Sequence, residues 1–287
     1  MDPIFKWTGG KRKEIKIFSK YFPEFVLEKK EYKYIEPFFG GGAVYWHLEN
    51  SNNVINDIDS DLINFLLNVR DKFGEIKLMA DKVSSFIKAI TEKEKEKSLT
   101  ISEAKTERGK LYYDWRNKDR NNGISNLSDV DRAFRFYIIN QLAFNGMRRF
   151  NSRGEFNIPY GNYKAFNMHI DDKHINLLKN TNLYNTSYKD IILNNDHENT
   201  FIFLDPPYTR EFNEYSHGNT FGAEDQIDLS NIFKSIKNAK VMLVINKDEF
   251  ISGLYSEYIK DEYDLRYSTN IKNRFDNSVK HLIITNY

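Results

Sequence analysis

The tetrad Asp205-Pro206-Pro207-Tyr208 is the strongest candidate for chemistry in this sequence. The four apolar residues before it, 201–204, predict a buried central strand. Because proline cannot continue the hydrogen-bond ladder of a sheet, the tetrad must follow the strand at its carboxyl end, the edge where open α/β sheets bind ligands. The chain has only six prolines. An adjacent pair between a carboxylate and an aromatic ring therefore favours a functional site over a plain turn.

The residue types of the tetrad suit attack by a nucleobase amine on an electrophile. An amino group conjugated to a heteroaromatic ring is a poor nucleophile, and acceptors that hold its protons stabilise the positive charge that develops during attack. The Asp205 carboxylate supplies one acceptor, and the carbonyl of Pro206 can supply a second. Tyr208 offers a ring on which a base can stack.

A glycine-rich loop, Glu36-Pro37-Phe38-Phe39-Gly40-Gly41-Gly42, follows an earlier predicted strand. Such a loop alone is weak evidence for a nucleoside site. Asp57 strengthens it, because this residue ends the next strand, roughly 20 residues on, where a carboxylate can accept hydrogen bonds from both ribose hydroxyls. The loop contains no Gly-Lys-Ser/Thr, which excludes a P-loop. A carboxylate placed to bind ribose, next to a loop without a phosphate-binding motif, favours S-adenosylmethionine over NAD or ATP as the cofactor.

The polar segment Lys6-Trp7-Thr8-Gly9-Gly10-Lys11 near the N-terminus has two interpretations. It can be a flexible leader. Alternatively it is a lid over the cofactor, in which Trp7 stacks on the ligand and Lys11 meets a carboxylate. The segment alone does not separate these two alternatives.

The elements that must position these residues are predicted by hydrophobic pattern. Strands are expected at 34–38, 54–56, 183–188, 201–204, 240–245 and 281–285, with short helical structure at 43–49 and a helix at 225–237. Long amphipathic segments occupy 61–142, and a hairpin is expected at 147–159. The pattern predicts an α/β protein with a largely parallel sheet, whose residues 1–59 and 170–287 form one domain and 60–169 an inserted one.

Composition excludes several classes of protein. The 287 residues include no cysteine, which rules out disulfide scaffolds, cysteine-ligated zinc and thiol nucleophiles. No apolar run approaches the roughly 18 residues of a membrane span, so the expectation is a soluble, cytosolic protein. The six histidines have no metal-ligand spacing, and no metal is expected.

Charge is unevenly distributed along the chain. Residues 60–169 carry 20 Lys and Arg against 14 Asp and Glu, whereas the flanks carry 22 against 27. Within 132–164 there are six basic residues and one acidic residue, Glu155. Chance can produce such an asymmetry, but it is also what a polyanion-binding insertion would show.

Together these motifs resemble the Dam-like family of DNA adenine methyltransferases over nearly the whole chain. The resemblance rests on six segments in order: Lys6-Trp7-Thr8-Gly9-Gly10-Lys11, Glu36-Pro37-Phe38-Phe39-Gly40-Gly41-Gly42, Asn56-Asp57-Ile58-Asp59-Ser60-Asp61-Leu62, Phe144-Asn145-Gly146-Met147, Gly154-Glu155-Phe156-Asn157-Ile158-Pro159-Tyr160-Gly161 and Asp205-Pro206-Pro207-Tyr208. It implies a Rossmann-like S-adenosylmethionine-dependent sheet with an inserted helical and β-hairpin target-recognition domain. Two segments, 209–213 and 270–275, depart from the best-known members and leave the recognition sequence open.

The resemblance implies methyl transfer from S-adenosylmethionine to the exocyclic amine of an adenine flipped out of duplex DNA. Its catalytic residues would be Asp205, Pro206 and Tyr208. The cofactor would be bound by Trp7, Lys11, Phe38, Gly40, Gly42, Asp57, Tyr188 and Asp205. DNA would be bound by Lys6, Asn145, Arg148, Arg149, Arg153 and Pro159, with Lys6 reading a guanine before the adenine in a site similar to GATC.

Two alternatives remain at this stage. One is an amino methyltransferase acting on cytosine or RNA, although relatives acting on cytosine more often carry serine at the position of Asp205. The other is a catalytically silent DNA-binding protein that keeps the fold. The enzyme is expected to act as a monomer on DNA, and a cognate restriction endonuclease is a candidate partner.

Overall fold

The computed structural model describes residues 1–208, 221–266 and 278–287. Its contacts divide the chain into two compact units. The sheet unit comprises Lys11–Ile58 and the described residues of Tyr184–Asn213 and Asn219–Tyr287. The helical unit comprises Met1–Gly10 and Asp59–Leu183.

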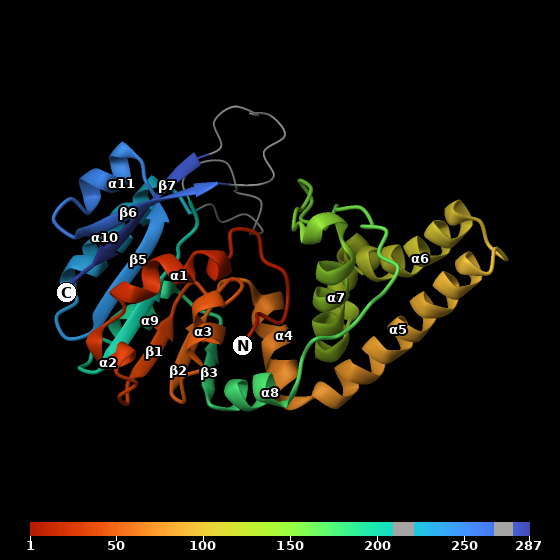
Figure 1. Ribbon diagram of the computed structural model, residues 1–287, viewed down its shortest axis with the longest axis horizontal. Helices are drawn as coiled ribbons and strands as arrows, with labels where there is room; N and C mark the ends of the chain where they lie inside the picture. The colour runs from red at the N-terminus through yellow and green to blue at the C-terminus, as the bar shows by residue number, and fades with distance from the viewer. Residues whose placement is uncertain (209–220, 267–277) are drawn as a thin grey trace. The chain divides into compact units, whose positions relative to one another are not determined.

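The described strands form a seven-stranded sheet in the order β3-β2-β1-β4-β5-β7-β6 (Figure 1), and all of them lie in the sheet unit except β3, of which only Tyr184 belongs to that unit. The strands are β1 (Lys33–Glu36), β2 (Asn53–Asn56), β3 (Thr181–Tyr184), β4 (Thr200–Leu204), β5 (Lys240–Asn246), β6 (Ile259–Arg266) and β7 (Ser278–Thr285). β1 pairs in parallel with β2 and β4, and β4 with β5, whereas β7 runs antiparallel to β5 and β6. This arrangement confirms the predicted α/β class.

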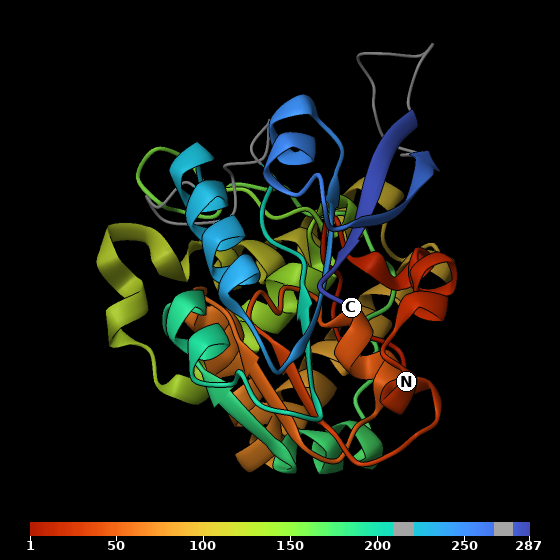
Figure 2. The same ribbon diagram turned by 90° about the vertical axis from the view of Figure 1, so that its left-hand side faces the viewer.

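The side chains of β4 point alternately to the two faces of the sheet, and both faces are buried. Ile202 and Leu204 join a core with residues of α9 (Tyr188–Leu193), α10 (Ala223–Ser235) and α11 (Glu249–Leu254). Phe203 faces the other way and stacks on Phe18 of α1 (Ile15–Phe18), with ring centroids 5.7 Å apart. Figure 2 shows helices on both faces of the sheet. A strand covered on both sides must be apolar at every position, which explains the unbroken run at 201–204.

Short elements connect the strands of this unit. The chain passes through η1 (Lys11–Lys13), η2 (Ser19–Tyr21) and α2 (Glu24–Leu27) before β1, and α3 (Ala43–Leu48) follows the glycine-rich loop. The predicted strand 183–188 is wrong in its second half. Ser187 caps α9 by accepting a hydrogen bond from the Lys189 amide, so Tyr188 begins a helix. The antiparallel strand β6 was not predicted.

The helical unit contains α4 (Ser60–Asp71), α5 (Phe73–Lys95), α6 (Ile101–Arg116), η3 (Asn117–Asn126), α7 (Asp129–Leu142), η4 (Phe144–Gly146) and α8 (Asp172–Lys179). Side chains at Asp59, Thr100, Ser128 and Asp171 cap α4, α6, α7 and α8. Capping satisfies amide groups that have no partner inside a helix. After α7 the chain forms the expected hairpin, in which Phe150 pairs with Phe156.

The N-terminal segment packs within the helical unit. The Phe5 ring lies edge-on to Phe65 of α4 and Phe136 of α7, with centroids 5.8 Å and 5.6 Å away. Asn140 of α7 accepts a hydrogen bond from the Lys6 amide at 3.0 Å and donates one to the Lys6 carbonyl at 2.7 Å. The two units therefore differ from the predicted division 1–59 and 170–287 against 60–169. Aromatic packing draws residues 1–10 to the inserted helices, and α8 stays with α4.

Among the described residues, no helix is long and apolar enough to cross a membrane. In the same residues, no group of three or more histidine or acidic side chains is arranged to hold a metal ion.

Candidate active site

The tetrad Asp205–Tyr208 leaves the carboxyl end of β4 at the point where the strand order reverses. β1 lies next to β4, with Ile35 beside Ile202, and β1 leads into the glycine-rich loop. Open α/β sheets bind ligands at such a reversal, because the two loops diverge there and leave a crevice. The register therefore places the loop after Glu36 and the tetrad at the same edge.

Lys11 joins the start of the sheet unit to this tetrad. Its side chain is only 2% exposed, and its Nζ lies 2.8 Å from Asp205 Oδ1 and 2.5 Å from the Tyr208 hydroxyl. The prediction gave Lys11 a cofactor carboxylate as its partner. The structure instead pairs it with the catalytic candidates, and its contact with the cofactor stays a prediction.

The ionisation of Asp205 is set by opposing effects. Burial of the carboxyl group raises its pKa, and the ion pair with Lys11 opposes the rise. Glu14 raises the pKa further by its negative charge, and His281 lowers it. An acceptor for amine protons must be deprotonated, so the balance among these neighbours determines the pH at which Asp205 can act.

The glycine-rich loop needs glycine at two of the predicted cofactor positions. Gly40 and Gly42 have φ of 49° and 62°, in the left-handed region. A Cβ at Gly42 would lie 2.2 Å from the ring of Phe39. Asp57, at the end of β2, accepts a hydrogen bond from the Gly40 amide at 2.8 Å and so braces the loop.

An aromatic cluster lies beside this loop. The Phe38 ring is 4.9 Å from Tyr188 and 5.6 Å from Phe221, and the latter two rings are 5.7 Å apart. Phe38 and Tyr188 were predicted to contact the cofactor. Phe221 was missed, since no motif surrounds it, and only its place just before α10 brings it here. Three rings next to a carboxylate and an open backbone loop fit the flat base and ribose of a nucleoside cofactor.

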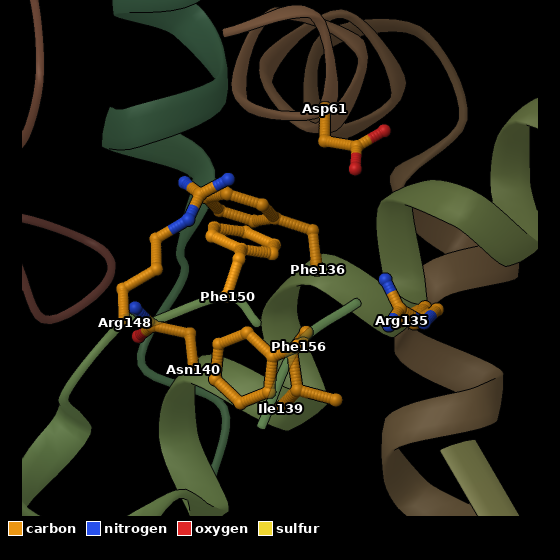
Figure 3. Close-up of a pocket in the computed structure, with 8 residues that line it drawn as sticks. All are labelled: Asp61, Arg135, Phe136, Ile139, Asn140, Arg148, Phe150 and Phe156. Atoms are coloured by element: carbon orange, nitrogen blue, oxygen red, sulfur yellow. The ribbon is translucent and has the colours of Figure 1, made fainter. Parts of the chain in front are cut away.

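Arg148 has contacts that differ from its predicted role in DNA binding. It forms an ion pair with Asp59, and its side chain is 11% exposed. Its guanidinium lies over the rings of Trp7, Phe136 and Phe150 at 5.0 to 5.5 Å, beside a small pocket (Figure 3). These contacts hold Arg148 within the helical unit, and its role in DNA binding stays a prediction. Trp7 packs in this same group, and its cofactor role stays a prediction.

The remaining DNA-binding candidates lie on the hairpin and its surroundings. Asn145, Arg153 and Pro159 are exposed, and Arg149 is half-buried with its Nε donating to Asn157 Oδ1 at 2.9 Å. Lys6 is exposed too, and its Nζ donates to the Gln141 carbonyl at 3.0 Å. Four of the six basic residues counted in 132–164 are ion-paired to acidic residues outside that range: Arg132 to Asp61, Arg135 to Asp119, Arg148 to Asp59 and Lys164 to Glu94. The local charge excess is therefore largely neutralised.

Comparison with known proteins decides the family. Residues 7–271 match the sequence model of a protein family, the D12 class N6 adenine-specific DNA methyltransferases. The chain belongs to this family. Its members are methyltransferases that act on adenine in DNA, which confirms the resemblance drawn from the six motifs.

Relatives of this D12-class methyltransferase are also named as methyltransferases or DNA adenine methylases. The type II methyltransferase M.CviBI of Paramecium bursaria Chlorella virus NC1A is 32% identical over 100% of both chains. The type II methyltransferase M1.LlaDCHI of Lactococcus lactis subsp. cremoris is 32% identical over 99% of this chain and 95% of its own. The DNA adenine methylase of Escherichia coli is 29% identical over 87% of this chain and 82% of its own. The segments 209–213 and 270–275, which depart from the family pattern, lie outside the described residues.

Proposed function

We propose that this DNA adenine methyltransferase uses Asp205, the Pro206 carbonyl and Tyr208 to hold and activate an adenine flipped out of the duplex. The observation that carries the proposal is the position of the tetrad beside the glycine-rich loop at the strand-order reversal, with Lys11 bonded to Asp205 and Tyr208. Asp205 and the Pro206 carbonyl accept hydrogen bonds from the amino group, and Tyr208 stacks on the base.

The cofactor proposal rests on the fit of the sheet-unit residues to S-adenosylmethionine. Phe38, Tyr188 and Phe221 would enclose the adenine, Asp57 would accept from the ribose, and Gly40 and Gly42 would let the backbone approach. When bound, this cofactor supplies an electrophilic methyl group. We also retain Trp7 and Lys11 as proposed cofactor contacts.

The activity and its site are testable together. Purified protein, plasmid DNA and radiolabelled S-adenosylmethionine should give labelled DNA, and sequencing of modified bases in cells expressing the protein should place the methyl group on adenine at one sequence. Label in cytosine or RNA, or no label, would contradict the assignment. The type II names of two relatives support a further proposal, that a cognate restriction endonuclease accompanies this enzyme. The bacterial relatives are consistent with a location in a prokaryotic cytosol or nucleoid.

Sequence choice is expected to depend on Lys6 and Arg149. Lysine can donate to both O6 and N7 of guanine, so Lys6 favours a G before the methylated A. The Arg149 Nε is held by Asn157, and its two Nη groups would read a guanine in the 3′ half of the site. We expect Arg149→Ala to cost about 1–3 kcal/mol of discrimination downstream of the adenine, and Lys6→Ala to relax discrimination upstream.

Competition between duplexes with single-base substitutions measures this discrimination. Arg132→Ala is the matched control, because Arg132 is ion-paired to Asp61 in the helical unit. If Arg149→Ala slows methylation of every duplex by the same factor, Arg149 is a phosphate contact and the readout assignment is wrong.

Binding to DNA is expected to weaken with salt in proportion to the phosphates contacted. Each contact contributes about −0.9 to the log–log slope of affinity against salt. Arg153 is exposed at the hairpin tip, so Arg153→Ala should make the slope less steep by about one contact's contribution. Arg135→Lys is expected to leave the slope unchanged, since Arg135 is buried against Asp119. A salt-independent Kd for the unmodified protein would refute a DNA-facing hairpin.

A further inference from the structure

A buried carboxylate and a buried imidazole lie behind the proposed active site. Glu14 follows η1, and His281 lies on β7; they are 4% and 0% exposed. His281 Nδ1 is 2.8 Å from Glu14 Oε2. The two residues are 267 positions apart in sequence, and neither belongs to a motif used above.

Tyr263 completes this group from the neighbouring strand β6. The strand register sets Tyr263 opposite His281, and their rings lie edge-on with centroids 5.5 Å apart. The Tyr263 hydroxyl donates to Glu14 Oε2 at 2.6 Å. One oxygen of Glu14 is therefore shared by donors from both antiparallel strands.

The group contacts the proposed active site at two points. The Tyr208 ring packs edge-on against His281, with centroids 5.7 Å apart. The Glu14 amide donates to the Lys11 carbonyl at 2.8 Å, so both residues belong to one turn, and Lys11 Nζ reaches Asp205 and Tyr208. Tyr208 is held by Lys11 at its hydroxyl and by His281 at its ring.

Burial of the Glu14 carboxylate and the His281 imidazole lowers the stability of the fold unless their interactions compensate, which suggests a functional reason for keeping them. Burying charged groups is energetically unfavourable, and apolar residues of similar volume in their place often give an equally stable or more stable protein. Burial alone would raise the pKa of Glu14, but hydrogen bonds from His281 and Tyr263 and the charge of Lys11 lower it below its usual value. Glu14 is thus kept as a carboxylate close to Asp205.

We propose that Glu14, His281 and Tyr263 are positioning residues for methyl transfer, which fix Tyr208 and Lys11 and balance the charge around Asp205. The inference rests on the catalytic roles proposed for Asp205 and Tyr208.

The charge balance gives the proposal a signature in the pH profile. Within the described part of the chain, the ionisable groups that interact with Asp205 or with its partner Lys11 are Lys11, Glu14, Tyr34, Glu36, Tyr208, Tyr263 and His281. The charge of Glu14 raises the pKa of Asp205 and that of His281 lowers it. If ionised Asp205 is the active form, Glu14→Gln should move the acid limb of the rate to lower pH. His281→Gln should move the same limb to higher pH.

The experiment measures single-turnover methyl transfer against pH, with saturating S-adenosylmethionine and cognate duplex. Glu14→Gln, His281→Gln and Tyr263→Phe are compared with Glu262→Gln, which removes a half-buried carboxylate, paired with Lys247 and Lys280, from the same strand as Tyr263. We expect the first two to shift the limb in opposite directions, and Tyr263→Phe to lower the plateau rate about tenfold. The cofactor Kd should stay within twofold in all four, and Glu262→Gln should behave as the unmodified protein.

Comparison with Asp205→Ala separates this inference from the function on which it rests. If Asp205→Ala retains its rate, the proposed catalytic site is wrong. If Asp205→Ala is inactive while the profiles of Glu14→Gln, His281→Gln and Tyr263→Phe match the unmodified protein, or if the two limbs shift in the same direction, only the positioning role is overturned. A lower Tm with unchanged profiles would also overturn it, because the group would then be purely structural.

Discussion

Asp205→Ala is expected to slow methyl transfer by roughly a hundredfold to a thousandfold, because it removes the acceptor proposed to hold the nitrogen where positive charge develops. Comparable preorganised hydrogen-bonding groups contribute about 3–4 kcal/mol to transition-state stabilisation. The measurement is the single-turnover rate at saturating cofactor and DNA. The cofactor Kd should change much less, since the lost interaction forms mainly in the transition state.

Controls for this variant must account for Lys11, whose buried ammonium loses its ion pair. Thermal unfolding and DNA binding of Asp205→Ala should therefore be measured alongside the rate. Asp205→Asn keeps one acceptor oxygen without the charge and is expected to retain more activity than the alanine variant. A near-normal rate in folded Asp205→Ala would remove the tetrad from the mechanism.

Asp57→Ala is expected to weaken S-adenosylmethionine binding by one to two orders of magnitude and to leave the saturated rate nearly unchanged. Asp57 already braces the loop through the Gly40 amide, 2.8 Å away, and is proposed to accept from the ribose. Hydrogen bonds to charged groups contribute about 1.5–3 kcal/mol. Ribose contacts are equal in the ground and transition states, so their loss affects binding rather than the chemical step.

Calorimetric titration with the cofactor measures this effect directly. Glu262→Gln, which changes a half-buried carboxylate in the same unit, should bind the cofactor normally. An unchanged Kd for Asp57→Ala would contradict the ribose assignment, even if the variant were less stable. Together the two aspartate variants should separate cofactor binding from catalysis.

Three features of the candidate site could be predicted from the sequence: the strand that precedes Asp205–Tyr208, the glycine-rich loop, and the place of Asp57 at the end of a strand. These features are local: an apolar run ended by prolines, glycines in left-handed backbone and a carboxylate at the end of a strand. Each depends on a few neighbouring residues, so its physical cause can be read from the chain. The parallel sheet followed from the alternation of such segments.

The partners of the charged residues could not be predicted from the sequence. The basic excess in 132–164 is neutralised by Asp59, Asp61, Glu94 and Asp119, which are distant in sequence. In the same way, Lys11 pairs with Asp205 and Glu14 with His281 across most of the chain. An ion pair forms only where tertiary packing brings two distant elements together, and that packing depends on many weak contacts along the whole chain. A local sequence pattern contains no information on these contacts, so the pairings can be identified only in the folded structure.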